Sequence, residues 1–213
     1  MVLVAAFWYT VVAMLRLYDS PHSGNAYKVR LLLSQIGREY ERVELDLFKS
    51  ETRGAEFLGK NPHGRVPVLE LKTGEYIAES NAILYYLAQD TKFFPEDRVA
   101  QARVMRWMFF EQNTLEPPLA GARFLLKFNA KTLENESVAK RRRRAEQALL
   151  LMEIHLGAAR FFGSDSYSIA DTALYAYTHV ANEAEISLEG YPAIQSWVDR
   201  VKAEPGYVAI DEF

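Results

Sequence analysis

The sequence predicts two domains, an α/β domain in its N-terminal part and an all-helical domain in its C-terminal part. Two observations predict this division. Over residues 14–90, segments with a two-residue apolar period alternate with segments of helical period, and beyond residue 97 only the helical period remains. The expected boundaries are 14–90 for the α/β domain, 91–97 for a charged, proline-containing linker and 98–213 for the helical domain.

The α/β domain is expected to begin with a strand, a helix and a second strand. Residues 15–18 alternate as a strand, and residues 43–47 alternate apolar with charged side chains, as in a half-buried strand. Between them, apolar residues at i, i+3, i+4 and i+7 predict a helix that Gly37 ends: Val29, Leu32, Leu33 and Ile36.

A hairpin and a helix are expected to complete this domain. A short helical stretch at 53–59 leads through a turn at 61–64 into a strand at 66–71. A second strand at 76–78 pairs with it, and Ser80 is expected as the N-cap of the next helix. Strand, helix, strand, hairpin and helix, in this order, predict a thioredoxin-like domain.

The C-terminal part is expected to contain only helices. Long periodic stretches cover residues 98–127 and 135–160. Ser168 and Asp171 stand at capping-box spacing ahead of an apolar run, so a helix is expected to begin there. Pro192 is expected to begin the last helix.

Composition excludes several classes of function. The chain has 213 residues, 49% of them apolar, which is enough for a sizeable core and not typical of disorder. With 25 Lys and Arg against 28 Asp and Glu it is slightly acidic, which disfavours nucleic-acid binding. The basic run 140–144 wraps all sides of a helix and is interpreted as a solvated surface.

The absence of cysteine removes every mechanism that uses a protein thiol, and also disulfides and thiolate metal sites. The histidines are scattered without ligand spacing, so no metal is expected. They are His22, His63, His155 and His179.

The first 13 residues form an apolar run without charge. The run is too short to span a membrane, and the positive region that begins a signal peptide is absent, although Val11-Val12-Ala13 satisfies the small-residue cleavage rule. Because Met14 opens a regular strand, residues 1–13 are interpreted as a translation-start extension. No membrane partner is expected.

Four segments together resemble one known family over residues 14–213. They are LYDSPHSGNAYKVRLLL at 17–33, NPHGRVPVLEL at 61–71, AESNAILYYLA at 78–88 and YSIADTALYAYTHVA at 167–181. These segments resemble the cytosolic glutathione S-transferases, in particular bacterial members that use serine or asparagine. The resemblance implies the glutathione transferase fold, a homodimer, a cytoplasmic location, a role in detoxification and glutathione as co-substrate.

The expected glutathione site begins at Glu79-Ser80. An acid beside a hydroxyl at a helix N-terminus matches both charges of the ligand's γ-glutamyl group, because the helix start favours the carboxylate and Glu79 attracts the ammonium. The resemblance implies a cis peptide before Pro67, with the main chain of Val66 bound to the cysteinyl unit. Arg65 is expected to bind the glycine carboxylate, and Arg53 is a weaker candidate.

Activation of the glutathione thiol is expected to depend on a hydrogen-bond donor near the first helix. The resemblance places Ser23 first, at the position of the catalytic hydroxyl in serine-type members. Asn25 is the rival, because in some bacterial relatives the asparagine contacts sulfur. Tyr18 is less consistent with this role, since it lies within a strand as a packing aromatic.

The electrophile pocket is expected between the two domains, with Phe110, Asn113 and Arg123 in its lining. The main hypothesis is transfer of an alkyl or aryl group to glutathione. Two alternatives remain: a non-catalytic interaction module, like the transferase-like domains of elongation-factor gamma subunits, and a glutathione-dependent disulfide reductase without a protein cysteine. Isomerisation is disfavoured because Ser23-Gly24-Asn25 departs from the Ser-Ser-Cys of isomerases.

Overall fold

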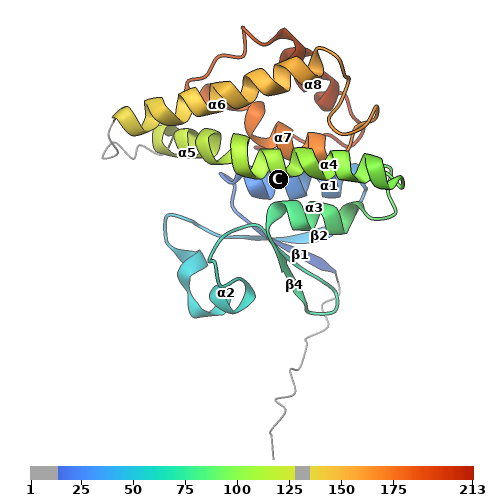
Figure 1. The fold of residues 1–213 in the computed structure, drawn as a ribbon. Coiled ribbons are helices and arrows are strands. Elements are labelled where there is room, and N and C mark those ends of the chain that lie inside the picture. Colours follow the sequence, from blue (N-terminus) through green and yellow to red (C-terminus); the bar gives the residue numbers. More distant parts are fainter. Residues whose placement is uncertain (1–13, 128–134) are drawn as a thin grey trace, which may run out of the picture.

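The N-terminal part of the molecule is a four-stranded mixed sheet flanked by helices (Figure 1). The computed structural model describes residues 14–127 and 135–213, so the interpretation of residues 1–13 falls outside the described part. The strands are β1 (Leu15–Asp19), β2 (Tyr40–Glu44), β3 (Val68–Glu70) and β4 (Tyr76–Ala78). Their order is β2-β1-β3-β4, with β1 parallel to β2 and the other pairs antiparallel. The expected thioredoxin-like arrangement is confirmed.

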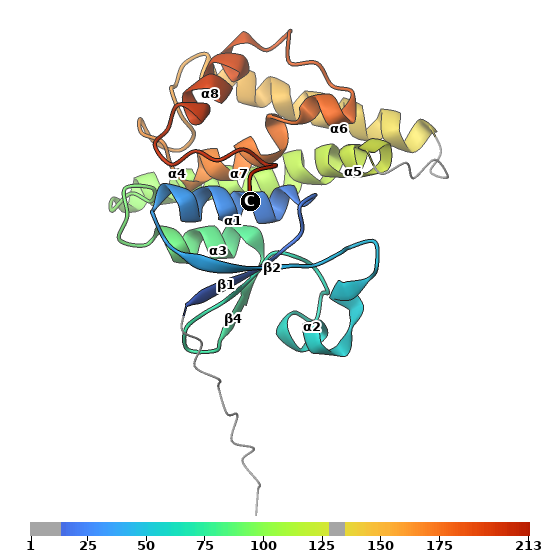
Figure 2. The same ribbon diagram turned by 180° about the vertical axis from the view of Figure 1, so that it is seen from behind.

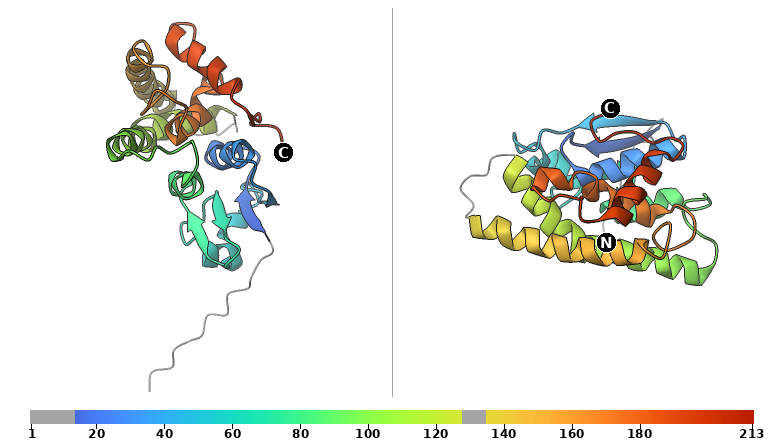
Figure 3. Two further views of the ribbon diagram at one scale, coloured as in Figure 1. Left: turned by 90° about the vertical axis from the view of Figure 1, so that its right-hand side faces the viewer. Right: turned by 90° about the horizontal axis from the view of Figure 1, so that it is seen from above.

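Because successive side chains of a strand point to opposite faces of the sheet, the strands contribute to two separate hydrophobic clusters. Leu17 and Leu69 point toward α1 (Gly24–Gln35) and α3 (Ser80–Ala88), and join the main core. On the other face, Tyr18 and Val68 form a small cluster with Phe57 of α2 (Ala55–Lys60). Because α1 and α3 lie between the sheet and the helices of the C-terminal part, they carry the contact between the two parts of the molecule (Figure 3).

The C-terminal part is helical, as expected. Its helices are α4 (Arg98–Phe110), α5 (Glu116–Lys127), α6 (Asn135–Leu156), α7 (Ile169–Thr178) and α8 (Pro192–Lys202). Every residue of α7 is buried, and this helix packs directly on α1. At this contact a Cβ on Gly24 would lie 2.7 Å from the ring of Tyr177, so glycine is required for the close approach.

Several expected boundaries are shifted by local geometry. The stretch expected as one helix over 98–127 contains a π-helical turn, Glu111–Leu115, and α6 ends at Leu156 rather than at 160. The second strand is expected at 43–47, but its paired part covers 40–44. Its partner β1 begins at Leu15, which pairs with Tyr40, and ends at Asp19, which pairs with Glu44.

The expectation that Ser80 caps α3 is wrong by one residue. Ser80 is the first helical residue, and Glu79 is the N-cap, with a φ of 69°. The carbonyl of Glu79 accepts the first intrahelical bond, from the Ile83 N–H at 3.0 Å. The positive φ turns the chain directly from β4 into the helix and is a conformation that non-glycine residues rarely adopt.

Residues 207–213 return from the helical part and run along α1 (Figure 2). The Tyr27 hydroxyl donates to the Val208 carbonyl at 2.8 Å, and the buried Arg30 guanidinium donates to the Ile210 carbonyl at 2.9 Å. The N-terminal domain is therefore held by main-chain groups from the far end of the sequence.

Candidate functional site

A small polar pocket of about 70 Å³ lies where α1 and α3 meet the segment that joins α4 to α5. It is lined by Asn25, Asn61, Arg65, Val66, Pro67, Glu79, Ser80, Gln112 and Glu116. The α/β domain supplies most of this lining, but Gln112 and Glu116 come from the helical domain. Both domains therefore contribute side chains to one site.

One wall of the pocket is the loop before β3. The Asn61 side chain holds this loop, since its Nδ2 donates to the Arg65 carbonyl at 2.8 Å and its Oδ1 accepts from the His63 N–H at 3.1 Å. The peptide between Val66 and Pro67 is cis. Val66 lies two residues before the first paired residue of β3, so its main chain stands outside the β1–β3 ladder at the pocket wall.

A second wall is the N-terminus of α3. Ser80 is buried, and the first N–H groups of the helix lack intrahelical acceptors, which favours an anion at this end. The Glu79 carboxylate is 61% exposed and lies 3.8 Å from Nδ1 of His63. Its charge is thus offered to solvent at the mouth of the pocket.

The third wall is the start of α1. Ser23 is the N-cap of this helix, and its Oγ accepts from the Ala26 N–H at 3.1 Å. Asn25 reaches the pocket: its Nδ2 donates to Oε1 of Glu116 at 3.1 Å, and its Oδ1 accepts from Oγ of Ser80 at 3.3 Å. The pocket lining includes Asn25 and not Ser23.

A buried ion pair lies behind this wall. Nζ of Lys28 is 2.8 Å from Oε1 of Glu111, and neither side chain is exposed to solvent. Nζ of Lys28 also donates to Oγ of Ser80 at 3.3 Å, and Nδ2 of Asn81 donates to Oε2 of Glu111 at 3.1 Å. Burial raises the pKa of Glu111, while the charge of Lys28 opposes that rise.

Two family models cover most of the chain. The model of the glutathione S-transferase N-terminal domain matches residues 13–89, and that of the C-terminal domain matches residues 115–205. The chain belongs to the glutathione S-transferase family.

Solved structures agree with this assignment. A glutathione S-transferase from Pseudomonas fluorescens Pf-5 is 40% identical with a TM-score of 0.90, and covers 94% of this chain and 100% of its own. A possible glutathione S-transferase from Rhodopseudomonas palustris is 41% identical with a TM-score of 0.92 and the same coverage. The chain is also 28% identical over 201 residues to the disulfide-bond oxidoreductase YfcG of Escherichia coli K12, covering 90% of this chain and 92% of that protein.

In this member of the family, five of the residues expected around glutathione line one pocket. They are Arg65, Val66, Pro67, Glu79 and Ser80. Arg53 does not line it: its side chain is exposed and its Nη1 donates to the His63 carbonyl at 3.2 Å. Arg53 thereby braces the loop that carries Arg65.

The three side chains expected to line a separate electrophile pocket are absent from the lining of the polar pocket. Phe110 packs edge-on against Trp107, with 5.1 Å between ring centroids. Asn113 is exposed, and its Nδ2 donates to the main chain of its own helix. Arg123 is buried and its Nη1 donates to the His22 carbonyl at 2.8 Å, so it links the two domains.

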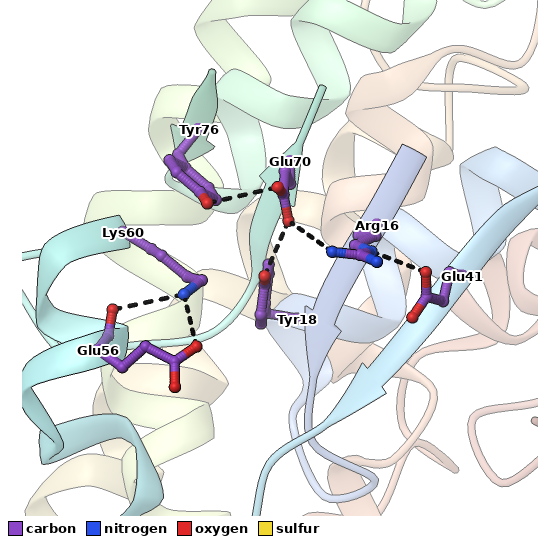
Figure 4. Close-up of polar contacts among 7 residues, drawn as sticks. All are labelled: Arg16, Tyr18, Glu41, Glu56, Lys60, Glu70 and Tyr76. Atoms are coloured by element: carbon purple, nitrogen blue, oxygen red, sulfur yellow. Dashed lines mark hydrogen bonds and ion pairs between the residues drawn. The ribbon is translucent and has the colours of Figure 1, made fainter. Parts of the chain in front are cut away.

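Tyr18 does not line this pocket; its ring belongs to the cluster with Phe57 of α2, and its polar contacts are drawn in Figure 4. Its hydroxyl donates to Oε2 of Glu70 at 2.8 Å, and the hydroxyl of Tyr76 donates to Oε1 of Glu70 at 3.3 Å. Nζ of Lys60 lies 5.5 Å from the Tyr18 ring centroid. Burial, followed by the bond to Glu70, raises the pKa of Tyr18. The side chain is thus engaged in holding α2 and the sheet together.

Sequence reasoning missed the residues that the helical domain contributes. Gln112 and Glu116 lie in and just after the π-helical turn, which interrupts the regular helical period. One available signal was the spacing of Asn25 and Lys28, which places two polar side chains on one face of α1.

Two further properties concern metals and membranes. Within residues 14–127 and 135–213, no group of three or more histidine or acidic side chains is placed to hold a metal ion. In the same ranges, the helices lack the combined length and apolar character that crossing a bilayer requires.

Proposed function

We propose that this protein is a glutathione transferase that binds glutathione in the polar pocket and activates its thiol for attack on a hydrophobic electrophile. The observation that carries the proposal is the convergence of Asn25, Val66 and Ser80 on one pocket. These three supply a side-chain amide, a main-chain edge and a helix N-terminus, from three separate segments.

The ligand's charges match the pocket in one orientation. The γ-glutamyl carboxylate would lie at the α3 N-terminus beside Ser80, and its ammonium near the exposed carboxylate of Glu79. The cysteinyl unit would pair with the main chain of Val66, as peptides pair with exposed strand edges. The glycine carboxylate would then meet Arg65.

Thiol activation requires a donor near the sulfur. A cysteine-like thiol with a pKa near 8.5 is only about 3% ionised at pH 7. A hydrogen bond to the charged thiolate contributes roughly 1.5–3 kcal/mol, which lowers the pKa by about one to two units. Asn25 is our first choice for this donor, because it lines the pocket, and the Ser23 hydroxyl is the second.

Disulfide reduction is a second candidate activity. The name of the relative YfcG, a disulfide-bond oxidoreductase, supports it. Because this chain has no cysteine, two glutathione molecules would have to supply both thiols. One glutathione thiolate would attack a disulfide and release a thiolate, leaving a mixed disulfide. A second glutathione thiolate would attack that mixed disulfide, giving oxidised glutathione and the second reduced thiol.

The proposal carries three further family features: a homodimer, a cytoplasmic location and a role in detoxification. Multi-angle light scattering of the purified chain tests the dimer. A single species at twice the mass of the 24.4 kDa chain is expected, and a monomer would contradict this part of the proposal.

The test of the main proposal is a pH titration of the ultraviolet absorbance of the glutathione thiolate bound to the full chain. We expect a bound thiol with a pKa at least one unit below that of the free ligand. No binding, or a bound thiol with unchanged pKa, would contradict it. Turnover of a panel of aryl halides against a panel of disulfides then distinguishes the transferase from the reductase.

A further inference from the structure

The Lys28–Glu111 pair joins the two domains at a place where neither charge meets solvent. Lys28 lies in the middle of α1, and Glu111 begins the π-helical turn between α4 and α5. The two charged atoms are 2.8 Å apart, and both side chains have zero exposure. π-Helical turns occur frequently at functional sites, since they redirect side chains within a helix.

Stability does not explain why this pair is ionic. Removing two charges from water is costly, and well-packed apolar pairs of similar volume are often at least as stable as buried ion pairs. The polar contacts of Lys28 indicate a different role. Besides Glu111, its ammonium contacts Oγ of Ser80, at the N-terminus that lines the pocket.

The ammonium determines the direction of the next hydrogen bond. A lysine ammonium has three protons to donate and no lone pair, so Oγ of Ser80 must accept from it. The single hydroxyl proton of Ser80 is then free to be donated, and the group 3.3 Å away is Oδ1 of Asn25. The ammonium of Lys28 therefore makes Ser80 the hydrogen-bond donor to Asn25.

Hydrogen bonds at both the oxygen and the nitrogen of the Asn25 amide fix its orientation. Oδ1 accepts from Ser80, and Nδ2 donates to the Glu116 carboxylate at 3.1 Å, which can only accept when ionised. The amide has two N–H groups. Among the described residues, Glu116 is the one side chain that accepts a hydrogen bond from them. One N–H remains for a ligand in the pocket.

We propose that Lys28 is a positioning residue that, through Ser80, holds the Asn25 amide with its NH₂ group toward bound glutathione. This inference rests on the proposed glutathione site. Without the ammonium, Ser80 could turn its proton elsewhere, and Glu116 alone would then hold the amide against reversal. In the reversed amide the oxygen would replace the NH₂ group. The Oδ1 lone pairs would then face the thiolate and disfavour it.

The test uses a variant that removes both charges together. Lys28→Met alone would leave Glu111 buried without its partner, and such a protein can fail to fold. The double variant Lys28→Met/Glu111→Leu leaves no buried charge, and Asn81 keeps its second acceptor, the Met108 carbonyl at 3.1 Å. We expect a folded protein that binds glutathione, with the bound thiol pKa raised by at least one unit and kcat/KM reduced at least tenfold.

An Asn25→Ala background separates positioning from general damage. If Lys28 acts through Asn25, the double change has no further effect on the bound thiol pKa once the amide is absent. A further rise of equal size in that background would overturn the inference. The control Arg142→Met/Glu185→Leu removes a different ion pair, 3.0 Å long, outside the pocket lining, and should leave the bound thiol pKa unchanged.

Failure of this inference is distinguishable from failure of the proposed function. A wild-type protein that does not lower the thiol pKa of glutathione contradicts the proposed function itself. A wild-type protein that lowers it, together with a folded Lys28→Met/Glu111→Leu variant that lowers it equally, contradicts only the role of Lys28.

Discussion

The indole nitrogen of Trp197 donates a 2.9 Å hydrogen bond to Oδ1 of Asp171, and so ties α8 to the start of α7. The same carboxylate accepts from the main-chain N–H groups of Phe162 and Ser168, each at 2.9 Å. Asp171 has no solvent exposure. One buried carboxylate thus joins the cap of the central helix, the preceding loop and the last helix.

Replacing Asp171 with alanine is therefore expected to destabilise the protein strongly. The change removes the helix cap and leaves buried donors without an acceptor, which together should cost about 3–5 kcal/mol. Urea denaturation measures the loss. Asp171→Asn, which keeps one acceptor oxygen, should lose less, and equal losses for both variants would contradict this account.

Asn25→Ala and Ser23→Ala are expected to affect different properties. Asn25→Ala should reduce kcat/KM by roughly 10- to 100-fold, since it removes the proposed donor to the thiolate. Ser23→Ala should mainly cost about 1 kcal/mol of stability, because the N-cap bond to Ala26 is lost. Steady-state kinetics and thermal unfolding measure both. A large loss of turnover in Ser23→Ala with full turnover in Asn25→Ala would reverse the assignment.

Glu79→Gln is expected to weaken glutathione binding about tenfold. The Glu79 carboxylate would accept a charge-assisted hydrogen bond from the γ-glutamyl ammonium, and tenfold corresponds to about 1.4 kcal/mol. Isothermal titration calorimetry measures the Kd. A glutathione analogue without that ammonium should bind wild type and variant equally, and a tenfold difference for that analogue would refute the contact.

His179 is expected to make stability depend on pH between about 4 and 6.5. Burial lowers its pKa to about 4, and its ring stacks on Tyr175 with 4.4 Å between centroids. The unfolded chain binds a proton below about 6.5 while the native protein does not, so stability is complete above that pH and falls as pH decreases. The total loss at pH 4 is about 3 kcal/mol.

The comparison with His179→Phe isolates this contribution. The variant lacks the titrating ring, while all other acidic and histidine side chains are retained. Urea denaturation at several pH values should show a shallower loss of stability for the variant below pH 6.5. Parallel pH profiles would show that His179 is protonated equally in the native and unfolded proteins.

Glu70 is expected to be important for the stability of the sheet, because its carboxylate accepts hydrogen bonds from Tyr18 of β1 and Tyr76 of β4 (Figure 4). Glu70→Ala would leave the buried hydroxyl of Tyr18 without its acceptor, at a cost of about 2 kcal/mol. The double variant Tyr18→Phe/Glu70→Leu removes both polar groups and should recover part of this loss. Denaturant unfolding measures both, and a double variant less stable than Glu70→Ala would contradict the explanation.

The fold was predictable where short-range signals are strong. The capping box of Ser168 and Asp171, Pro192 at the start of α8 and Gly37 after α1 are all confirmed. Each depends on residues a few positions apart. The π-helical turn at 111–115 was not predictable from local spacing, and its first residue, Glu111, pairs with Lys28, 83 positions earlier in the sequence.

The same distinction applies to the site. Residues that belong to family motifs, such as Val66 and Ser80, could be named from the sequence, and they do line the pocket. Gln112 and Glu116 reach the pocket only because the helical domain folds over α1, and no local pattern marks them. Phe110 and Asn113 stay predictions for a separate electrophile pocket, because helix position alone does not say which way each side chain turns.

The return of residues 207–213 to α1 bears on how the molecule reaches its native state. Tyr27 and Val208 are 181 positions apart, so closing this contact requires nearly the whole chain. Long-range contacts are slow to form, since loop closure must precede any gain from them. The N-terminal domain cannot complete its packing while the C-terminal helices are still being synthesised. Until residues 207–213 have been synthesised, the Arg30 guanidinium lacks the carbonyl acceptors that they provide.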